Sequence, residues 1–128
     1  METVAKALVL ASKAGRDPIE VRESQMCGFA ASKILDVHGE YMIKRTIDFG
    51  FRVRSHQRDL NLAQQCARTF GVGLPDTAME QEFVNTCAAQ GGAESGRSGI
   101  VRALERLANH KIRKGGRRCV EAVRPMYL

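Results

Sequence analysis

Apolar residues recur at helical spacing through most of the chain, and glycine or proline separates one run from the next. Residues 2–14 carry apolar side chains three and four positions apart, which predicts an amphipathic helix that Gly15 ends. Asp17 and Pro18 supply a cap and a first-turn proline for a second helix, which extends to about Met26. The very short loop between the two helices predicts that they are antiparallel neighbours.

The next part of the chain has a less regular pattern. Ser32 is positioned to cap a short helix that the pair His38–Gly39 closes. Residues 40–47 then resume a helical pattern. Residues 48–51 interrupt it and are interpreted as a loop whose aromatic side chains anchor it.

The clearest amphipathic pattern lies in residues 55–70. One face of this predicted helix carries Leu60, Ala63, Ala67 and Phe70. Gly71 ends it, and Pro75 begins the next helix, which the pair Gly91–Gly92 terminates. The apolar positions of that helix include Ala78, Met79, Phe83, Val84, Cys87 and Ala88. Ser98 is the predicted cap of a last helix, whose apolar residues are Ile100, Val101, Leu104 and Leu107.

No segment shows the strict alternation of a strand followed by a hairpin turn. The predicted fold class is therefore all-α, a compact bundle of about five to seven helices. A length of 128 residues fits one domain, which we place at residues 1–112. Residues 113–128 have no apolar period and are interpreted as a basic, flexible tail.

Positive charge is concentrated near the end of the chain. Residues 1–96 hold 11 basic and 12 acidic side chains, whereas residues 97–128 hold 9 basic and 2 acidic ones. Such a basic segment can attract nucleic acid. A solvated tail is the favoured interpretation, because Tyr127 is the one aromatic there on which a base could stack. Nucleic-acid binding therefore ranks last among the hypotheses.

The four cysteines, Cys27, Cys66, Cys87 and Cys119, are too far apart to form the close ligand pairs of a zinc site. We interpret Cys66 and Cys87 as small, buried apolar residues on helices. No apolar run approaches the roughly 20 residues that span a membrane. The chain also shows no secretion signal, so we expect a cytoplasmic protein with free thiols and no membrane partner.

Several short motifs occur in a characteristic order, namely Leu10–Gly15, Gly28–Ser32, Val37–Glu40, Met42–Thr46, His56–Ala63, Leu74–Pro75 and Leu104–His110. In this order and spacing they resemble the second, helical domain of the β-hydroxyacid dehydrogenases. Within that family the pattern is most similar to the 2-hydroxy-3-oxopropionate (tartronate semialdehyde) reductases, with the 3-hydroxyisobutyrate dehydrogenases as close relatives. The resemblance covers residues 2 to about 112.

The resemblance implies the second domain of a two-domain dehydrogenase. The family's Rossmann domain and catalytic lysine would lie upstream of Met1, so no catalytic residue and no metal site are expected in this chain. The intact enzyme would use NAD or NADP to interconvert a small 3-hydroxy acid and its semialdehyde, as a homodimer. The chain alone is not expected to bind the cofactor. The alternative is a catalytically silent helical module that serves dimerisation or another protein interaction.

Three residues are assigned to the cleft through the resemblance. Arg58 occupies the lysine position of the family's Lys-Asp-Leu motif, which implies contact with the nicotinamide end of the cofactor and with the substrate. Asp59 matches the motif and is assigned to substrate binding, either beside Arg58 or as a helix-start residue. Phe51 falls where an aromatic lines the substrate pocket, with core packing as the equal alternative. The chain departs from the family at Gly96, where an aspartate is usual.

Overall fold

The computed structural model describes residues 1–48 and 50–113. They form six α-helices: α1 (Glu2–Lys13), α2 (Pro18–Met26), α3 (Lys33–Lys44), α4 (Val53–Thr69), α5 (Pro75–Cys87) and α6 (Val101–Leu107). A π-helical turn, η1 (Ala88–Gly92), and a 3-10 turn, η2 (Arg97–Ile100), connect α5 to α6. Within these residues there is no strand, which confirms the all-α fold class and the number of helices. The tail beyond residue 113 and the aromatic Phe49 lie outside the described residues.

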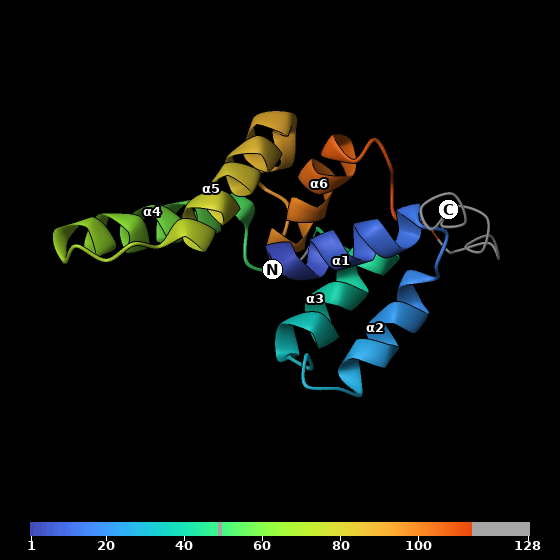
Figure 1. Ribbon diagram of the computed structural model, residues 1–128. Coiled ribbons are helices and arrows are strands. Elements are labelled where there is room, and N and C mark those ends of the chain that lie inside the picture. Colours follow the sequence, from blue (N-terminus) through green and yellow to red (C-terminus); the bar gives the residue numbers. More distant parts are fainter. Residues whose placement is uncertain (49, 114–128) are drawn as a thin grey trace, which may run out of the picture.

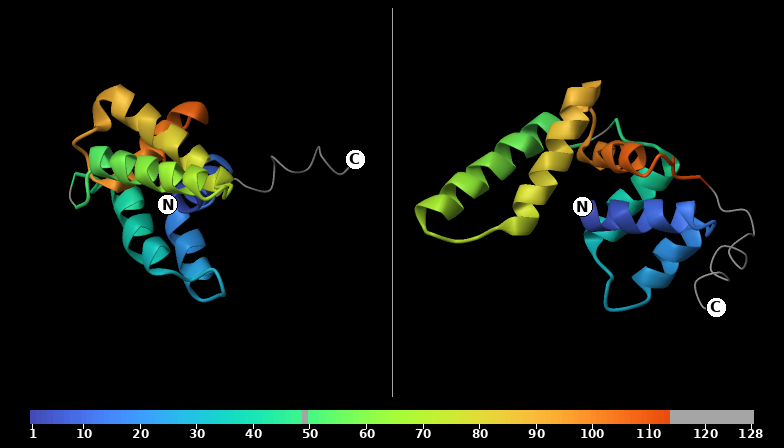
Figure 2. Two further views of the ribbon diagram at one scale, coloured as in Figure 1. Left: turned by 90° about the vertical axis from the view of Figure 1, so that its left-hand side faces the viewer. Right: turned by 45° about the horizontal axis from the view of Figure 1, so that its top comes forward.

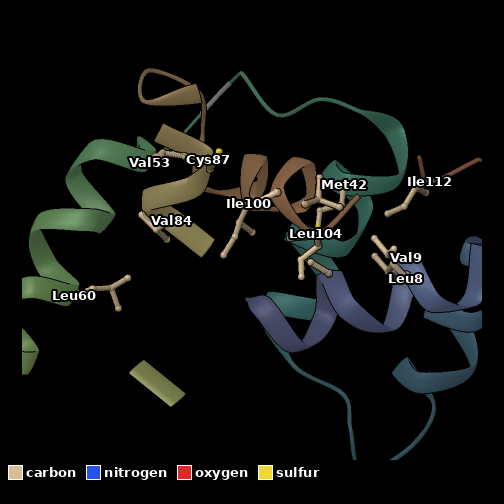
Figure 3. Close-up of a cluster of buried hydrophobic side chains, with 13 residues drawn as sticks. Leu8, Val9, Met42, Val53, Leu60, Val84, Cys87, Ile100, Leu104 and Ile112 are labelled. Atoms are coloured by element: carbon tan, nitrogen blue, oxygen red, sulfur yellow. The ribbon is translucent and has the colours of Figure 1, made fainter. Parts of the chain in front are cut away.

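The helices divide into a compact body and a hairpin (Figure 1). Helices α1, α2, α3 and α6 pack around one another, while α4 and α5 lie side by side and extend away from them (Figure 2). A single apolar core continues from the body to the base of the hairpin (Figure 3). Its buried members include Leu8, Val9, Met42, Val53, Leu60, Val84, Cys87, Ile100, Leu104 and Ile112.

The predicted starts of two helices are confirmed in atomic detail. The Asp17 carboxylate accepts a hydrogen bond from the Ile19 amide at 2.9 Å, and the Ser32 hydroxyl accepts one from the Leu35 amide at 3.0 Å. Each bond satisfies a backbone donor that has no partner within its own helix. Gly15, with φ near 78°, follows α1 as predicted and adopts the left-handed conformation that glycine tolerates best.

The predicted end of α3 at His38–Gly39 is wrong, because the helix continues through both residues to Lys44. It stops at Arg45, which adopts a left-handed conformation with φ of 62°. The buried Gly39 leaves room for a neighbouring side chain, since a Cβ there would lie 3.4 Å from the side chain of Arg22. The Arg22 guanidinium donates to the Leu35 carbonyl at 3.2 Å. This glycine therefore serves helix packing instead of helix termination.

The predicted apolar face of residues 55–70 is buried only at Leu60. Ala63 is exposed, Phe70 is 75% exposed, and Cys66 is exposed, so the predicted burial of Cys66 is wrong. Met79 on α5 is exposed as well. The physical reason for α4 is that its far half and the loop to α5 extend beyond the body (Figure 2). Met79 lies closer to the body, where its sulfur is 3.3 Å from the Lys6 ammonium group of α1, yet it stays half-exposed.

The last helix also differs from the prediction. Residues 97–100 form a 3-10 turn, and α6 begins at Val101 without a side-chain cap. Ser98 is buried, and its hydroxyl lies 2.8 Å from Nδ1 of His38, so the predicted capping role is wrong. Leu107 is exposed. Cys87, in contrast, is buried as predicted and donates from its thiol to the Gly99 carbonyl at 3.3 Å.

Gly92 is a position where any side chain would collide with the core. A Cβ built there lies 2.8 Å from the Cys87 sulfur and 2.9 Å from the Cys87 carbonyl oxygen. We expect Gly92→Ala to lower the free energy of unfolding by about 1–3 kcal/mol, as overpacking does. Gly73→Ala is the matched control, because a Cβ there meets no atom within 4 Å. Urea unfolding measures both; equal effects of the two substitutions would contradict the packing argument.

Candidate functional site

Arg58 and Asp59 are neighbours on α4, and both side chains face solvent. The Arg58 side chain is 76% exposed, and its Nε lies 4.0 Å from Oδ1 of Asp59. An ion pair at this distance on the surface contributes little to stability. The assignment of Arg58 and Asp59 to the cleft stays a prediction.

Phe51 lies just before α4 and is 43% exposed, so it does not belong to the buried core. Its ring meets the His56 ring edge-on, with centroids 6.2 Å apart and planes at 76°. The Arg97 guanidinium carbon lies 5.9 Å from the Phe51 ring centroid, which is within range of a cation–π interaction. The structure thus places a cation beside a half-exposed aromatic surface.

His38 links Arg97 to Ser98, an arrangement that the sequence did not reveal. Arg97 donates to Nε2 of His38 from Nη2 at 2.9 Å and from Nε at 3.3 Å. A guanidinium has no acceptor and stays protonated, so Nε2 must accept and the ring proton sits on Nδ1. Nδ1 then donates to the Ser98 hydroxyl at 2.8 Å. Burial, followed by the charge of Arg97, lowers the pKa of His38 below its ordinary value.

His56 and Glu80 connect the hairpin to this group. Nε2 of His56 lies 3.2 Å from a carboxylate oxygen of Glu80 on α5. The hydrogen bond from His56 lowers the pKa of Glu80 despite the opposing effect of burial, and the charge of Arg97 acts in the same direction. We call this group, made of His38, Phe51, His56, Glu80, Arg97 and Ser98, the Phe51–Arg97 cluster.

Backbone hydrogen bonds hold the two chain segments of the cluster together. The Arg97 amide donates to the Phe51 carbonyl at 2.7 Å, and the Val53 amide donates to the Ser95 carbonyl at 2.9 Å. Arg52 and Gly96 form an isolated antiparallel bridge between the same segments. Phe51 and Arg97 are therefore positioned by paired backbone, although 46 positions separate them in the chain.

The family resemblance assigned Phe51, Arg58 and Asp59 to one site, and only Phe51 belongs to the Phe51–Arg97 cluster. Arg58 follows the cluster residue His56 by two positions on α4 and forms no described ion pair or hydrogen bond with cluster residues. Arg97 and His38 were missed because residues nearly 60 positions apart give no local pattern. The one available signal was an arginine beside Ser98, the predicted cap of the last helix.

The described side chains support binding better than chemistry. The Phe51–Arg97 cluster offers one guanidinium, an aromatic face and a neutral histidine, a combination that can contact a small carboxylate ligand. Within residues 1–48 and 50–113, no three His, Cys, Asp or Glu side chains gather as metal ligands. The same part of the chain contains no helix with the length and hydropathy to cross a bilayer.

We predict that acid destabilises the fold through His38 and Glu80. His38 ordinarily titrates near pH 6.5, so below that pH the unfolded chain binds a proton that the folded cluster excludes. The free energy of unfolding therefore falls as the pH drops through this range. The lowered pKa of Glu80 has the same sign, because its ionised form is favoured in the fold until a lower pH.

Urea unfolding at a series of pH values measures this slope. His38→Asn is expected to flatten the dependence between about pH 7 and pH 5, while the loss below about pH 4.5 remains. An unchanged slope in that variant would show that His38 does not carry the effect.

Comparison with known proteins places these features in a family. Residues 1–104 match the family described as NAD-binding of NADP-dependent 3-hydroxyisobutyrate dehydrogenase. The 2-hydroxy-3-oxopropionate reductase of Escherichia coli (strain K12) is 55% identical over 112 residues, which cover 88% of this chain and 38% of that protein. Probable 3-hydroxyisobutyrate dehydrogenase-like 1, mitochondrial, of Arabidopsis thaliana is 32% identical over 109 residues, covering 85% and 33%.

The chain thus spans about a third of the length of these curated relatives. The match extends from α1 into the first part of α6 and includes Phe51, Arg58, Asp59 and Arg97 within its range. It confirms the resemblance drawn from the order of the short motifs. By this match, the chain belongs to the family of the NAD-binding domain of NADP-dependent 3-hydroxyisobutyrate dehydrogenases.

Proposed function

We propose that this chain is the substrate-cleft domain of an NAD(P)-dependent oxidoreductase acting on a small 3-hydroxy acid and its semialdehyde. The observation that carries the proposal is the 55% identity over 112 residues to a protein named 2-hydroxy-3-oxopropionate reductase. The half-exposed Phe51 beside Arg97 and the solvent-facing Arg58 support it, because a carboxylate substrate needs cations near an apolar wall.

The described residues fit one end of a dinucleotide and not the whole of it. Arg58 offers an exposed guanidinium and Phe51 a planar apolar surface. The glycine-rich turn between a strand and a helix, which holds a pyrophosphate, has no counterpart in the part of the chain that the structure describes. The proposal therefore assigns this domain the nicotinamide end and the substrate, with the remaining contacts made elsewhere in the enzyme.

The roles of the individual residues follow from their chemistry. A nicotinamide cofactor supplies the hydride when bound. Arg58 would hold the substrate carboxylate with paired N–H donors, and the adjacent carboxylate of Asp59 would orient that guanidinium. Phe51, held by Arg97 and His56, would exclude water from one side of the cleft. The proton donor would come from outside these residues.

A chimeric enzyme tests the proposal directly. Residues 1–112 of this chain would replace the matching segment of the E. coli reductase, and oxidation of NADH and NADPH with tartronate semialdehyde would be followed. Turnover with a KM close to that of the parent enzyme is expected. A folded, dinucleotide-binding chimera without turnover would show that this domain does not complete the cleft.

The α4–α5 hairpin favours a second candidate function, a helical module for dimerisation that carries no catalytic role. Its described surface exposes Leu62, Phe70, Val72, Leu74 and Met79. Exposed apolar side chains gathered on one projection are typical of a protein interface. Formation of a homodimer would cover these apolar side chains. We also propose that the enzyme is a homodimer and that it acts in the cytoplasm. Sedimentation equilibrium of the chain tests dimerisation, and a strictly monomeric chain at high concentration would contradict it. If the chain is dimeric and the chimeric enzyme is inactive, the results favour the catalytically silent module over the substrate-cleft domain.

A further inference from the structure

A second concentration of positive charge lies at the C-terminal end of α6, away from the Phe51–Arg97 cluster that precedes this helix. An open groove of about 470 Å³ is lined there by Arg45, Arg102, Arg106 and Lys111, together with Glu105 and His110. The cations come from three places: the end of α3, the exposed face of α6, and the segment that follows α6. Neither the family resemblance nor the proposed oxidoreductase reaction accounts for this groove.

Glu105 is the one carboxylate among the described residues of the groove, and its charge is already compensated. Its side chain is 5% exposed and accepts hydrogen bonds from Arg45 Nη1 at 2.5 Å and from the Ile112 amide at 2.7 Å. A buried carboxylate with two strong donors is a rigid anchor. Glu105 therefore fixes the end of α3 and the segment after α6 against each other, which gives the groove a defined shape.

The other cations have no carboxylate partner within the described part of the chain. Arg102 and Arg106 are four residues apart on α6 and therefore lie on the same face, where like charges oppose helix formation. Arg102 reaches only the Ser95 hydroxyl, at 3.4 Å. Lys111, in the segment after α6, also lines the groove and is exposed. This unfavourable gathering of charge would be relieved by an anion.

The end of α6 does not oppose an anion as strongly as a bare helix C-terminus would. Such an end normally presents unpaired carbonyls with partial negative charge. Here the Leu104 carbonyl accepts from the Ala108 amide, and the Glu105 carbonyl accepts from the His110 amide, both at 2.9 Å. The Ala108 carbonyl accepts from the Lys13 ammonium group. The carbonyls of Leu104, Glu105 and Ala108 are thus paired with donors, which weakens their repulsion of an anion.

We propose that this groove binds a small anion that carries a diphosphate group. Side chains four positions apart on a helix have Cβ atoms about 5–6 Å apart, so Arg102 and Arg106 can each contact one of two adjacent phosphoryl groups. The planar guanidinium donates paired hydrogen bonds to phosphate oxygens, and Lys111 adds a point charge from the segment after α6. A single carboxylate would leave at least one of these cations unmatched.

The test uses the full chain and inorganic pyrophosphate as the probe. Backbone amide chemical shifts of residues 102–112 should move and saturate during a titration at constant ionic strength. Arg102→Gln with Arg106→Gln is expected to weaken pyrophosphate binding at least about tenfold, the loss of one or two charge-assisted hydrogen bonds. Arg16→Gln with Arg68→Gln is the matched control, because it removes the same charge from exposed sites outside the groove and should leave binding within about twofold.

Two further titrations identify the source of the diphosphate and test the competing explanation. Tighter binding of ADP than of pyrophosphate would support a nucleotide ligand, and equal binding would support an inorganic or other diphosphate. Arg117→Gln with Arg118→Gln tests whether cations of the tail bind the anion instead. The proposal would be overturned if pyrophosphate binding does not saturate. It would also be overturned if the double substitution at Arg102 and Arg106 weakens pyrophosphate binding no more than the one at Arg16 and Arg68 or the one at Arg117 and Arg118.

Discussion

Leu8→Ala is expected to lower the free energy of unfolding by about 2–5 kcal/mol, the range for truncating a fully buried leucine. Leu8 has no exposed surface and lies in the core cluster between α1 and α6. Truncation loses the transfer free energy of the side chain and leaves a cavity that the surrounding helices fill only partly. For a domain whose total stability is about 5–15 kcal/mol, this loss is a large fraction.

Leu10→Ala provides the matched control on the same helix. Leu10 is 70% exposed, so the same chemical change there should alter stability by no more than about 0.5 kcal/mol. Urea unfolding followed by far-UV circular dichroism measures both variants. Similar losses at positions 8 and 10 would mean that α1 is not packed through the Leu8 face, which would contradict the fold.

Arg58→Ala is expected to lower kcat/KM of the chimeric reductase by about 10- to 100-fold, because one charge-assisted hydrogen bond contributes about 1.5–3 kcal/mol. This expectation rests on the proposed function. Stability should hardly change, since the Arg58 side chain is largely exposed and its pair with Asp59 is long. Steady-state kinetics and urea unfolding of the same variant separate the two effects.

Two variants sharpen this test. Arg58→Lys restores the residue of the family motif and should retain more activity than the alanine variant, although it loses the paired donors. Arg68→Ala, an exposed arginine near the end of the same helix, should leave kcat/KM within about twofold. If the Arg58 and Arg68 variants lose activity equally, Arg58 acts only through the general charge of α4.

Phe51 shows how a resemblance and a structure contribute differently to a site. The resemblance suggested the substrate pocket and left core packing as an equal alternative. The structure argues against core packing within this domain, because the Phe51 ring is half-exposed and the Arg97 guanidinium lies over it. The assignment to substrate binding stays a prediction for Phe51, Arg58 and Asp59. Arg97 and His38 joined the candidate site only after the chain segments had been placed together.

The sequence by itself determined the helices and most of their starts. Asp17, Pro18, Ser32 and Pro75 act through local hydrogen bonds or a restricted backbone angle, so their effects can be read from neighbouring residues. Apolar periodicity likewise predicts that a segment is helical, because the period belongs to the helix itself. The family, too, is identified by the order of local motifs.

Only the tertiary structure decided which apolar residues are buried and which polar residues meet. Cys66 and Phe70 have the spacing of a core face, yet the far end of α4 extends away from the body (Figure 2), so they stay exposed. Gly39 has the local character of a helix stop, but Arg22 packs across it. Ser98 has the residue type of a helix cap, but its hydroxyl forms a hydrogen bond with Nδ1 of His38, which lies 60 positions away in the chain. In each case a contact between distant residues, or the lack of one, overrides a local preference of about 1 kcal/mol.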